Sequence, residues 1–219
     1  MNIFIINLDK SEDRLKNYEN IKYNRWRAVD GKELDSNHSI FKEMNNNYGP
    51  KNYNSYLGTC GCFLSHITLW EHIVKNKLNN ILILEDDADI IDELPNIDEL
   101  PEDGITYLGG LFCNIKLRSG GIKKGVIESK NGINEVDKEK FRLLMTLSYY
   151  IPNYKIAEDL LNEIDEWRKK RLYRAIDITI SKMSKKIKKY YYYPAIYIER
   201  NVESIIAKKT KHPDKYYII

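Results

Sequence analysis

Two short apolar runs, each ending abruptly in polar residues, most constrain how this chain can fold. "NIFIINL" at residues 2–8 and "ILIL" at residues 81–84 have the composition of strands that are buried on both faces. Between them, residues 61–77 place apolar side chains at spacings of three and four, the period of a helix packed on a sheet. Strand, helix and strand in this order predict an α/β fold with a mostly parallel central sheet flanked by helices.

The rest of the chain continues this alternation. Residues 25–29 predict a strand before an Asp30-Gly31 turn, and Ser11 is expected to cap a helix after the first strand. Residues 35–57 are polar and predict a long loop or flap. Further strands are expected at 104–110, 141–152 and 190–200, a helix at 154–171, another along the stripe Ile176, Ile180, Met183 and Ile187, and a variable loop at 114–140.

The 219 residues contain no glycine-serine or proline-rich linker, so a single domain is expected. The net charge of +3 does not indicate a polycation, and nucleic acid is not an expected partner. Basic residues nevertheless concentrate between Arg168 and Lys189, with Asp177 as the one acid among them. This segment predicts either a solvated helix face or a contact with phosphates, an anionic membrane surface or an acidic glycan.

Cysteine usage and the absence of long apolar runs bear on the compartment. Cys60, Cys62 and Cys113 match neither a disulfide framework nor a zinc ribbon, so we interpret them as reduced thiols. The first residues turn polar too soon for a signal peptide, and no apolar run approaches the roughly 18 residues that span a bilayer. We therefore expect a cytoplasmic protein whose membrane contact, if any, is peripheral at the inner face.

Four carboxylates follow the second apolar run: Glu85, Asp86, Asp87 and Asp89. Ligands of open α/β sheets bind beyond the carboxyl ends of the strands, where these residues lie. Neighbouring anions repel one another, and a divalent cation removes that penalty. If the strand geometry continues, Glu85 and Asp87 point to one side and Asp86 to the other. The residues alone leave a solvated acidic turn and a cation site both open.

Several stretches together resemble glycosyltransferase family 25, which contains lipopolysaccharide-modifying transferases and collagen galactosyltransferases. They are "IINLDKSEDR" at 5–14, "AVDGKEL" at 28–34, "GCFLSHITLW" at 61–70 and "ILEDD" at 83–87, with weaker echoes in "AIDITIS" at 175–181 and "ERNVESII" at 199–206. The likeness is clearest over the first ninety residues. Each motif is weak alone, and it is their order and spacing that make the resemblance specific.

The resemblance implies a GT-A-like single domain, with residues 1–110 as the nucleotide-sugar-binding half and residues 111–219 as an acceptor-side half that carries the basic helical segment. It implies transfer of a hexose, galactose or glucose, with inversion, from a UDP-sugar to a glycan, lipid-linked or protein acceptor. By the same resemblance Asp87 holds Mn²⁺ or Mg²⁺ with support from Glu85, while Glu85 and Asp86 also contact the nucleotide.

Other residues in the matching stretches have two readings each. Asn7, Leu8 and Arg14, at the end of the first strand and in the turn after it, are nucleotide contacts by resemblance, although Arg14 can equally form a local ion pair. Asp30 contacts the nucleotide or makes a tight turn.

Ser65 and His66 are predicted to line the donor site. Direct neighbours on a helix point about 100° apart, so they cannot form a nucleophile-base pair. A packed, hydrogen-bonded histidine is the competing interpretation of His66.

An inverting transferase needs a general base for the acceptor hydroxyl. Asp177 in "AIDI" is the preferred candidate, with a helix N-cap as its competing role, and Glu199 is the alternate base. Two other functions stay open. One is a catalytically inactive nucleotide-sugar-binding or scaffold protein, and the other is a metal-dependent phosphoesterase that uses the same carboxylates.

Overall fold

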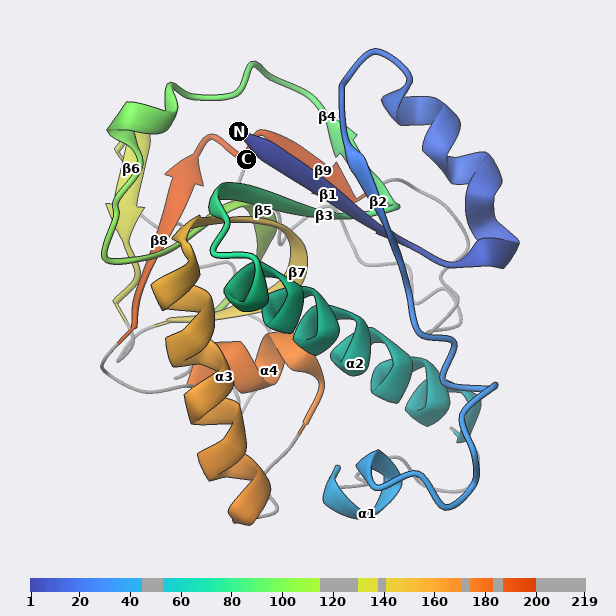
Figure 1. The fold of residues 1–219 in the computed structure, drawn as a ribbon. Coiled ribbons are helices and arrows are strands. Elements are labelled where there is room, and N and C mark those ends of the chain that lie inside the picture. The colour runs from blue at the N-terminus through green and yellow to red at the C-terminus, as the bar shows by residue number, and fades with distance from the viewer. Residues whose placement is uncertain (45–52, 115–129, 138–140, 171–173, 183–186, 200–219) are drawn as a thin grey trace.

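The computed structural model describes residues 1–44, 53–114, 130–137, 141–170, 174–182 and 187–199. Its centre is a seven-stranded sheet in the order β2-β1-β3-β7-β5-β8-β6 (Figure 1). Five strands run in one direction, and β7 and β6 oppose them. The predicted α/β class with a mostly parallel sheet is therefore confirmed. The strands are β1 (Asn2–Asn7), β2 (Asn24–Arg27), β3 (Asn79–Glu85), β5 (Gly104–Asn114), β6 (Gly132–Glu135), β7 (Phe141–Asn153) and β8 (Lys188–Tyr193).

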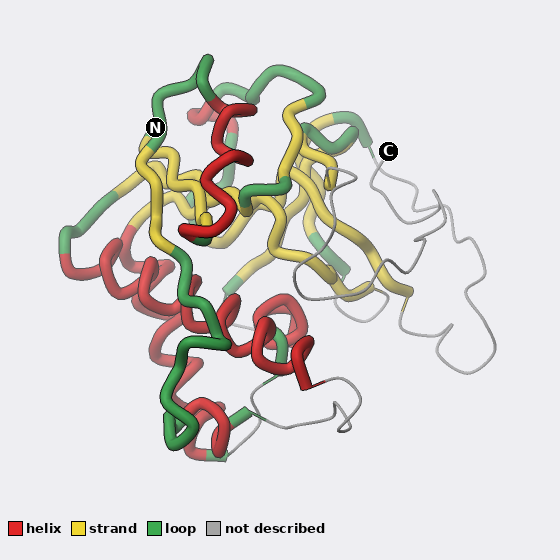
Figure 2. The backbone as a smooth tube through the Cα atoms, turned by 90° about the vertical axis from the view of Figure 1, so that its right-hand side faces the viewer, coloured by secondary structure: helices red, strands yellow, loops and turns green. Residues whose placement is uncertain are grey.

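Both faces of the sheet are covered, as the two apolar runs predict. Phe4 and Ile6 of β1 belong to one core, under the helices α2 (Tyr53–Lys75), α3 (Tyr154–Lys169) and α4 (Ile176–Lys182). Ile3 and Ile5 belong to a second core, which includes Tyr18 of the 3-10 helix η1 (Asp9–Tyr18). Figure 2 shows η1 on the opposite side of the sheet from the α-helices. Full burial of each such side chain contributes about 1.5–3 kcal/mol to folding.

A small two-stranded sheet extends this second layer. It pairs β4 (Ala88–Ile90) with β9 (Tyr197–Glu199) in antiparallel fashion (Figure 1). The predicted late strand at 190–200 is thus two strands, β8 and β9, separated by Pro194, which has no backbone N–H to donate to a sheet. The short 3-10 helix η3 (Ile97–Glu99) precedes β5.

The predicted loop at 35–57 is partly wrong. It contains the helix α1 (Ile40–Glu43), and α2 begins at Tyr53. Tyr56 and Cys60 are buried and continue the stripe of Phe63 at spacings of four and three, so packing extends the helix into a segment of polar composition. Residues 45–52 of this loop lie outside the described residues.

Other boundaries also differ from the predictions. The second strand ends at Arg27, and Ser11 lies at a kink inside η1, with φ −124° and ψ 26°, rather than at its start. Within the predicted loop at 114–140, residues 132–135 form β6, and 115–129 and 138–140 are not described. The last helical stripe stops at Lys182, so Ile187 is buried outside a helix, and Met183 is not described.

The basic segment from Arg168 to Lys189 is not one helical face. Its described members lie at the end of α3, before and at the end of α4, and in β8, and Lys189 is buried. The two halves of the chain share one sheet, because β7 from the second half lies between β3 and β5. None of the helices in the described ranges combines the length and apolarity that a membrane crossing requires.

Candidate functional site

A pocket of about 110 Å³ opens at the carboxyl ends of the parallel strands β2, β1 and β3, against the side of α2. This edge of the sheet is where ligands of open α/β folds bind. The lining includes eight of the predicted site residues: Leu8, Arg14, Asp30, Ser65, His66, Glu85, Asp86 and Asp87. The fold therefore gathers the quoted motifs at one place, although their residues are far apart in the chain.

Asp86 ties the end of β3 to the start of η1. Its Oδ2 accepts a hydrogen bond from Asn7 Nδ2 at 2.7 Å, and its Oδ1 pairs with Arg14 Nη1 at 2.8 Å. Burial raises the pKa of the Asp86 carboxyl, and the hydrogen bond and charge of Arg14 oppose that rise. Both carboxylate oxygens thus have protein partners. This geometry gives Asp86 a structural role, and its contact with a nucleotide stays a prediction.

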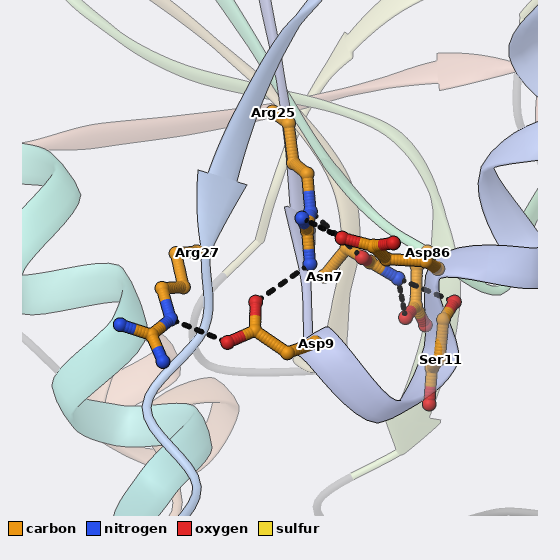
Figure 3. Close-up of polar contacts among 7 residues, drawn as sticks. Asn7, Asp9, Ser11, Arg25, Arg27 and Asp86 are labelled. Atoms are coloured by element: carbon orange, nitrogen blue, oxygen red, sulfur yellow. Dashed lines mark hydrogen bonds and ion pairs between the residues drawn. The ribbon is translucent and has the colours of Figure 1, made fainter.

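Asn7 is fully buried behind this ion pair and does not line the pocket. Its Nδ2 donates to Asp86 and to the Ser11 carbonyl at 2.8 Å, while its Oδ1 accepts from Arg25 Nε at 3.0 Å (Figure 3). Because a guanidinium only donates, Arg25 determines which end of the amide faces Asp86. Arg25 in turn pairs with Asp9 at the start of η1. The network holds η1 against the end of β1.

Two glycines let residues 28–31 lie directly against α2. A methyl group on Gly61 would come within 2.4 Å of the Val29 carbonyl oxygen, and one on Gly31 within 1.8 Å of the Leu57 carbonyl oxygen. Ser65 joins the same two segments, since its Oγ accepts from Val29 N at 2.8 Å and donates to Gly61 O at 2.7 Å. The Ser65 hydroxyl is therefore bound to main chain, a structural use that the predicted role in the donor site did not anticipate.

A chain of buried hydrogen bonds runs from the core to Glu85. Trp70 Nε1 donates to the Tyr149 hydroxyl at 3.0 Å, and that hydroxyl lies 2.7 Å from His66 Nδ1. Because a carboxylate oxygen only accepts, Glu85 Oε1 takes its hydrogen bond from His66 Nε2, and in a neutral ring Nδ1 then accepts from the Tyr149 hydroxyl. The His66 proton then resides on Nε2, which faces Glu85 Oε1 at 3.3 Å. His66 is fully buried, and the expectation of a packed, hydrogen-bonded histidine is confirmed.

Three carboxylates influence the thiol of Cys62. Burial raises the pKa of its thiol well above the ordinary value, and the negative charges of Glu85, Asp177 and Asp87 raise it further. Glu85 and Asp87 line the pocket and come from the end of β3 and the turn after it. Oxygen donors gathered in this way fit Mn²⁺ or Mg²⁺, because a divalent cation offsets their mutual repulsion.

Asp177 is not part of the pocket lining, but its charge acts on Cys62 and on Tyr107. It lies in the first turn of α4 rather than at the N-cap, because the helix already begins at Ile176. Its Oδ1 accepts a hydrogen bond from the backbone N–H of Ile178 at 2.7 Å. The helix α4, whose first turn carries Asp177, contacts α2, the helix that lines the pocket.

The alternate base candidate, Glu199, lies in β9. In the register of the β4–β9 pair it is opposite Ala88, the residue after Asp87. Its main chain is therefore beside the acidic turn, whereas its side chain lies outside what the structure describes.

Two lysines at the pocket were not predicted. Lys32 lines the pocket, and Lys10 forms an ion pair with Asp30. Burial acts to raise the pKa of Asp30, but the hydrogen bond and charge of Lys10, with Lys32, outweigh it and lower that pKa. Both lysines stand inside the stretches "IINLDKSEDR" and "AVDGKEL", but no role was predicted for either of them.

Comparison with known proteins gives matches to the part of the chain that forms the pocket. The model of the family described as "Glycosyltransferase family 25 (LPS biosynthesis protein)" matches residues 1–180. A "Glycosyltransferase 25 family member" of Drosophila pseudoobscura pseudoobscura is 36% identical over 97 residues, which cover 39% of this chain and 15% of the relative. Human "Procollagen galactosyltransferase 2" is 35% identical over 98 residues, with the same two shares.

A mouse protein named "Inactive glycosyltransferase 25 family member 3" is 37% identical over 67 residues, or 28% of this chain and 11% of its own length. The matched region thus spans about 15% of the length of the first relatives. Among solved structures, the galactosyltransferase LgtC in complex with donor and acceptor sugar analogs aligns over 86% of this chain and 73% of its own. That alignment has a TM-score of 0.46 and 12% identity.

Proposed function

Because the chain belongs to glycosyltransferase family 25, we propose that it is an inverting, divalent-metal-dependent hexosyltransferase of GT-A-like architecture. The donor is a UDP-sugar carrying galactose or glucose, and the acceptor is a hydroxyl of a glycan, glycolipid or protein. One observation supports this proposal above the others. The pocket at the ends of β1 and β3 places carboxylates beside an arginine and a lysine, the chemistry that a metal-bound diphosphate requires.

Glu85 and Asp87 are the proposed metal ligands. Both line the pocket, and their charges converge on Cys62. A bound Mn²⁺ or Mg²⁺ supplies positive charge that stabilises the diphosphate leaving group as the glycosidic bond breaks. The hydrogen bond from His66 keeps one Glu85 oxygen fixed, and the Trp70–Tyr149 pair behind it holds the imidazole. A carboxylate side chain held in this way loses less conformational entropy when it binds the metal ion.

Arg14 and Lys32 are the proposed phosphate contacts. Arg14 Nη1 pairs with Asp86 Oδ1, and this ion pair anchors the guanidinium at the wall of the pocket. Lys32 reaches the lining from the turn after residue 30, and its backbone N–H is held by Asp30 Oδ1 at 3.0 Å. Positive side chains from the segments that follow two neighbouring strands suit a diphosphate that lies across the edge of the sheet.

Asp177 is the proposed general base. Its role is to take the proton of the acceptor hydroxyl as that oxygen attacks the anomeric carbon from the face opposite the diphosphate. Its place in the first turn of α4, a helix that contacts the pocket helix α2, supports a position near the donor pocket. Glu199, on the strand paired with β4, is the alternate base.

A second function has a specific observation in its favour. Three of the relatives that match this region are named inactive or probably inactive members of the same family. The same pocket can hold a nucleotide sugar without transferring it, and the chain is then a binding or scaffold protein.

Turnover distinguishes the two functions. Wild-type protein with Mn²⁺ is incubated with UDP-galactose or UDP-glucose and a panel of galactoside, glucoside and collagen-peptide acceptors, and released UDP is measured. Acceptor-dependent UDP release, lost on removal of the metal, supports the transferase. Saturable UDP binding with no release on any acceptor supports the inactive alternative, and release of phosphate from simple phosphate esters indicates a phosphoesterase.

A further inference from the structure

The floor of the pocket carries three side chains whose donor atoms face one another. Cys62 and His66 are four residues apart on α2 and therefore share one face of the helix. Glu85 ends β3 directly against that face. The Cys62 Sγ, a ring nitrogen of His66 and a carboxylate oxygen of Glu85 all lie within 4.8 Å of one another. One soft donor, one imidazole and one carboxylate form a mixed set unlike the all-oxygen set of Glu85 and Asp87.

The spacing of these atoms fits a small tetrahedral ion. Zinc-nitrogen and zinc-oxygen bonds of about 2.0–2.1 Å at a tetrahedral angle place the two donor atoms about 3.3 Å apart. His66 Nε2 and Glu85 Oε1 are 3.3 Å apart without any movement. A zinc-sulfur bond of about 2.3 Å places the sulfur about 3.6 Å from each of the other two donors. Cys62 Sγ lies within 4.8 Å of both, so a side-chain movement of about 1 Å completes the third position.

The surroundings supply what a metal-binding histidine and thiol require. His66 has its second ring nitrogen, Nδ1, on the Tyr149 hydroxyl at 2.7 Å, and such a partner fixes the ring of a metal-bound histidine. Cys62, His66 and Glu85 all belong to the pocket lining, and Cys62 and Glu85 are partly exposed, so an ion reaches the buried His66 ring past these two side chains. The charges of Glu85, Asp177 and Asp87, which disfavour an isolated thiolate at Cys62, attract a cation to the same place.

We propose that Cys62 Sγ, His66 Nε2 and Glu85 Oε1 form a binding site for a thiophilic divalent cation of the zinc class, which shares Glu85 with the proposed Mn²⁺ or Mg²⁺ site and uses Cys62 and His66 in place of Asp87. On binding, the Cys62 thiol releases its proton to solvent. His66 stays neutral, because its proton leaves Nε2 and Nδ1 takes one up. Nδ1–H then donates to the Tyr149 hydroxyl, which changes from donor to acceptor.

Two consequences follow from this geometry. When the His66 proton moves to Nδ1, the Tyr149 hydroxyl no longer has an acceptor for its hydrogen. The lost hydrogen bond lowers the affinity for the cation, so we expect the cation to exchange with solvent. Three protein ligands leave a fourth position open toward the pocket. Since Glu85 belongs to both sites, the thiophilic cation competes with the ion of the proposed transferase and inhibits it.

Cobalt(II) is the probe of choice, because it replaces zinc and gives a sulfur-to-cobalt charge-transfer band only when a thiolate is bound. Reduced wild-type protein titrated with Co²⁺ is expected to develop this band with saturation near one equivalent, and excess Zn²⁺ is expected to abolish it. Cys62→Ser should lose the band. Cys60→Ser is the matched control, because Cys60 is fully buried on the same helix with its Sγ 3.6 Å from Met44 Sδ, and it should keep the band.

Glu85→Gln tests the third ligand, with a weakening of Co²⁺ binding of at least tenfold expected. Circular dichroism of each variant confirms that it is folded. No charge-transfer band in the wild type, or a band that persists in Cys62→Ser, overturns the site. The proposed function fails separately: UDP binding with Mn²⁺ and no cobalt band removes this inference alone, whereas a cobalt band without UDP binding removes the transferase alone.

Discussion

The hydroxyl of Tyr149 is expected to be a main stabilising element behind the pocket, and Tyr149→Phe tests this. The substitution keeps the ring, which is fully buried and stacked on His66, and removes only the oxygen. Two buried groups then lose their partner, Trp70 Nε1–H at 3.0 Å and His66 Nδ1 at 2.7 Å. Each unsatisfied buried group costs about 1–3 kcal/mol, so the free energy of unfolding should fall by about 2–6 kcal/mol.

Tyr197→Phe is the matched control for this experiment. Tyr197 is also buried, in the core on the other face of the sheet, and its hydroxyl has no hydrogen-bond partner among the described residues. Removal of that hydroxyl should leave the stability unchanged or raise it. Urea unfolding of both variants, followed by circular dichroism with midpoints and slopes compared, provides the measurement. A Tyr149→Phe loss no larger than the Tyr197→Phe change would refute the hydrogen-bond chain.

Three other substitutions test separate parts of the site. Gly61→Ala forces a methyl against the Val29 carbonyl oxygen, and thermal unfolding should show a loss of about 1–3 kcal/mol, whereas an unchanged midpoint would contradict the close approach. Asp30 has a lowered pKa, so the stability from its pair with Lys10 is present above the unfolded value of 3.8 and is lost as pH falls through the folded pKa. The stability difference between wild type and Asp30→Asn should therefore shrink toward low pH, and a constant difference would rule this out. Asp177→Asn should lower the transfer rate about 10²- to 10⁴-fold with UDP binding retained, and a drop under tenfold would exclude it as the base.

The sequence predicts those elements of the fold whose pattern of apolar residues lies within the element itself. In β1 the apolar residues alternate between two cores, Ile3 and Ile5 on one side and Phe4 and Ile6 on the other, as an unbroken apolar run indicates. The start of α2 was missed because its buried Tyr56 stands in a segment of polar composition, where only tertiary packing supports the helix. The order of the strands could not be predicted from the sequence either, since no local pattern places β7 between β3 and β5.

The same division holds for the site. The carboxylates after β3 and Arg14 after β1 could be named because strand ends and turns are readable in the chain. The role of Tyr149 could not, because it reaches His66 across 83 positions and lies inside an apolar strand. The sequence indicated only a reduced thiol at Cys62, and only the fold shows that Glu85 lies close to it. The helical spacing of Cys62 and His66 was the one available signal for that pair.

The central claim is that the pocket at the ends of β1 and β3 is a metal-dependent UDP site. Calorimetric titration of UDP, with and without Mn²⁺, on wild type, Asp87→Ala and the exposed control Asp92→Ala tests it most directly. If the pocket is such a site, UDP binding needs Mn²⁺, persists in Asp92→Ala and is lost in Asp87→Ala. Absence of UDP binding under every condition, or equal binding in all three proteins without metal, would contradict it.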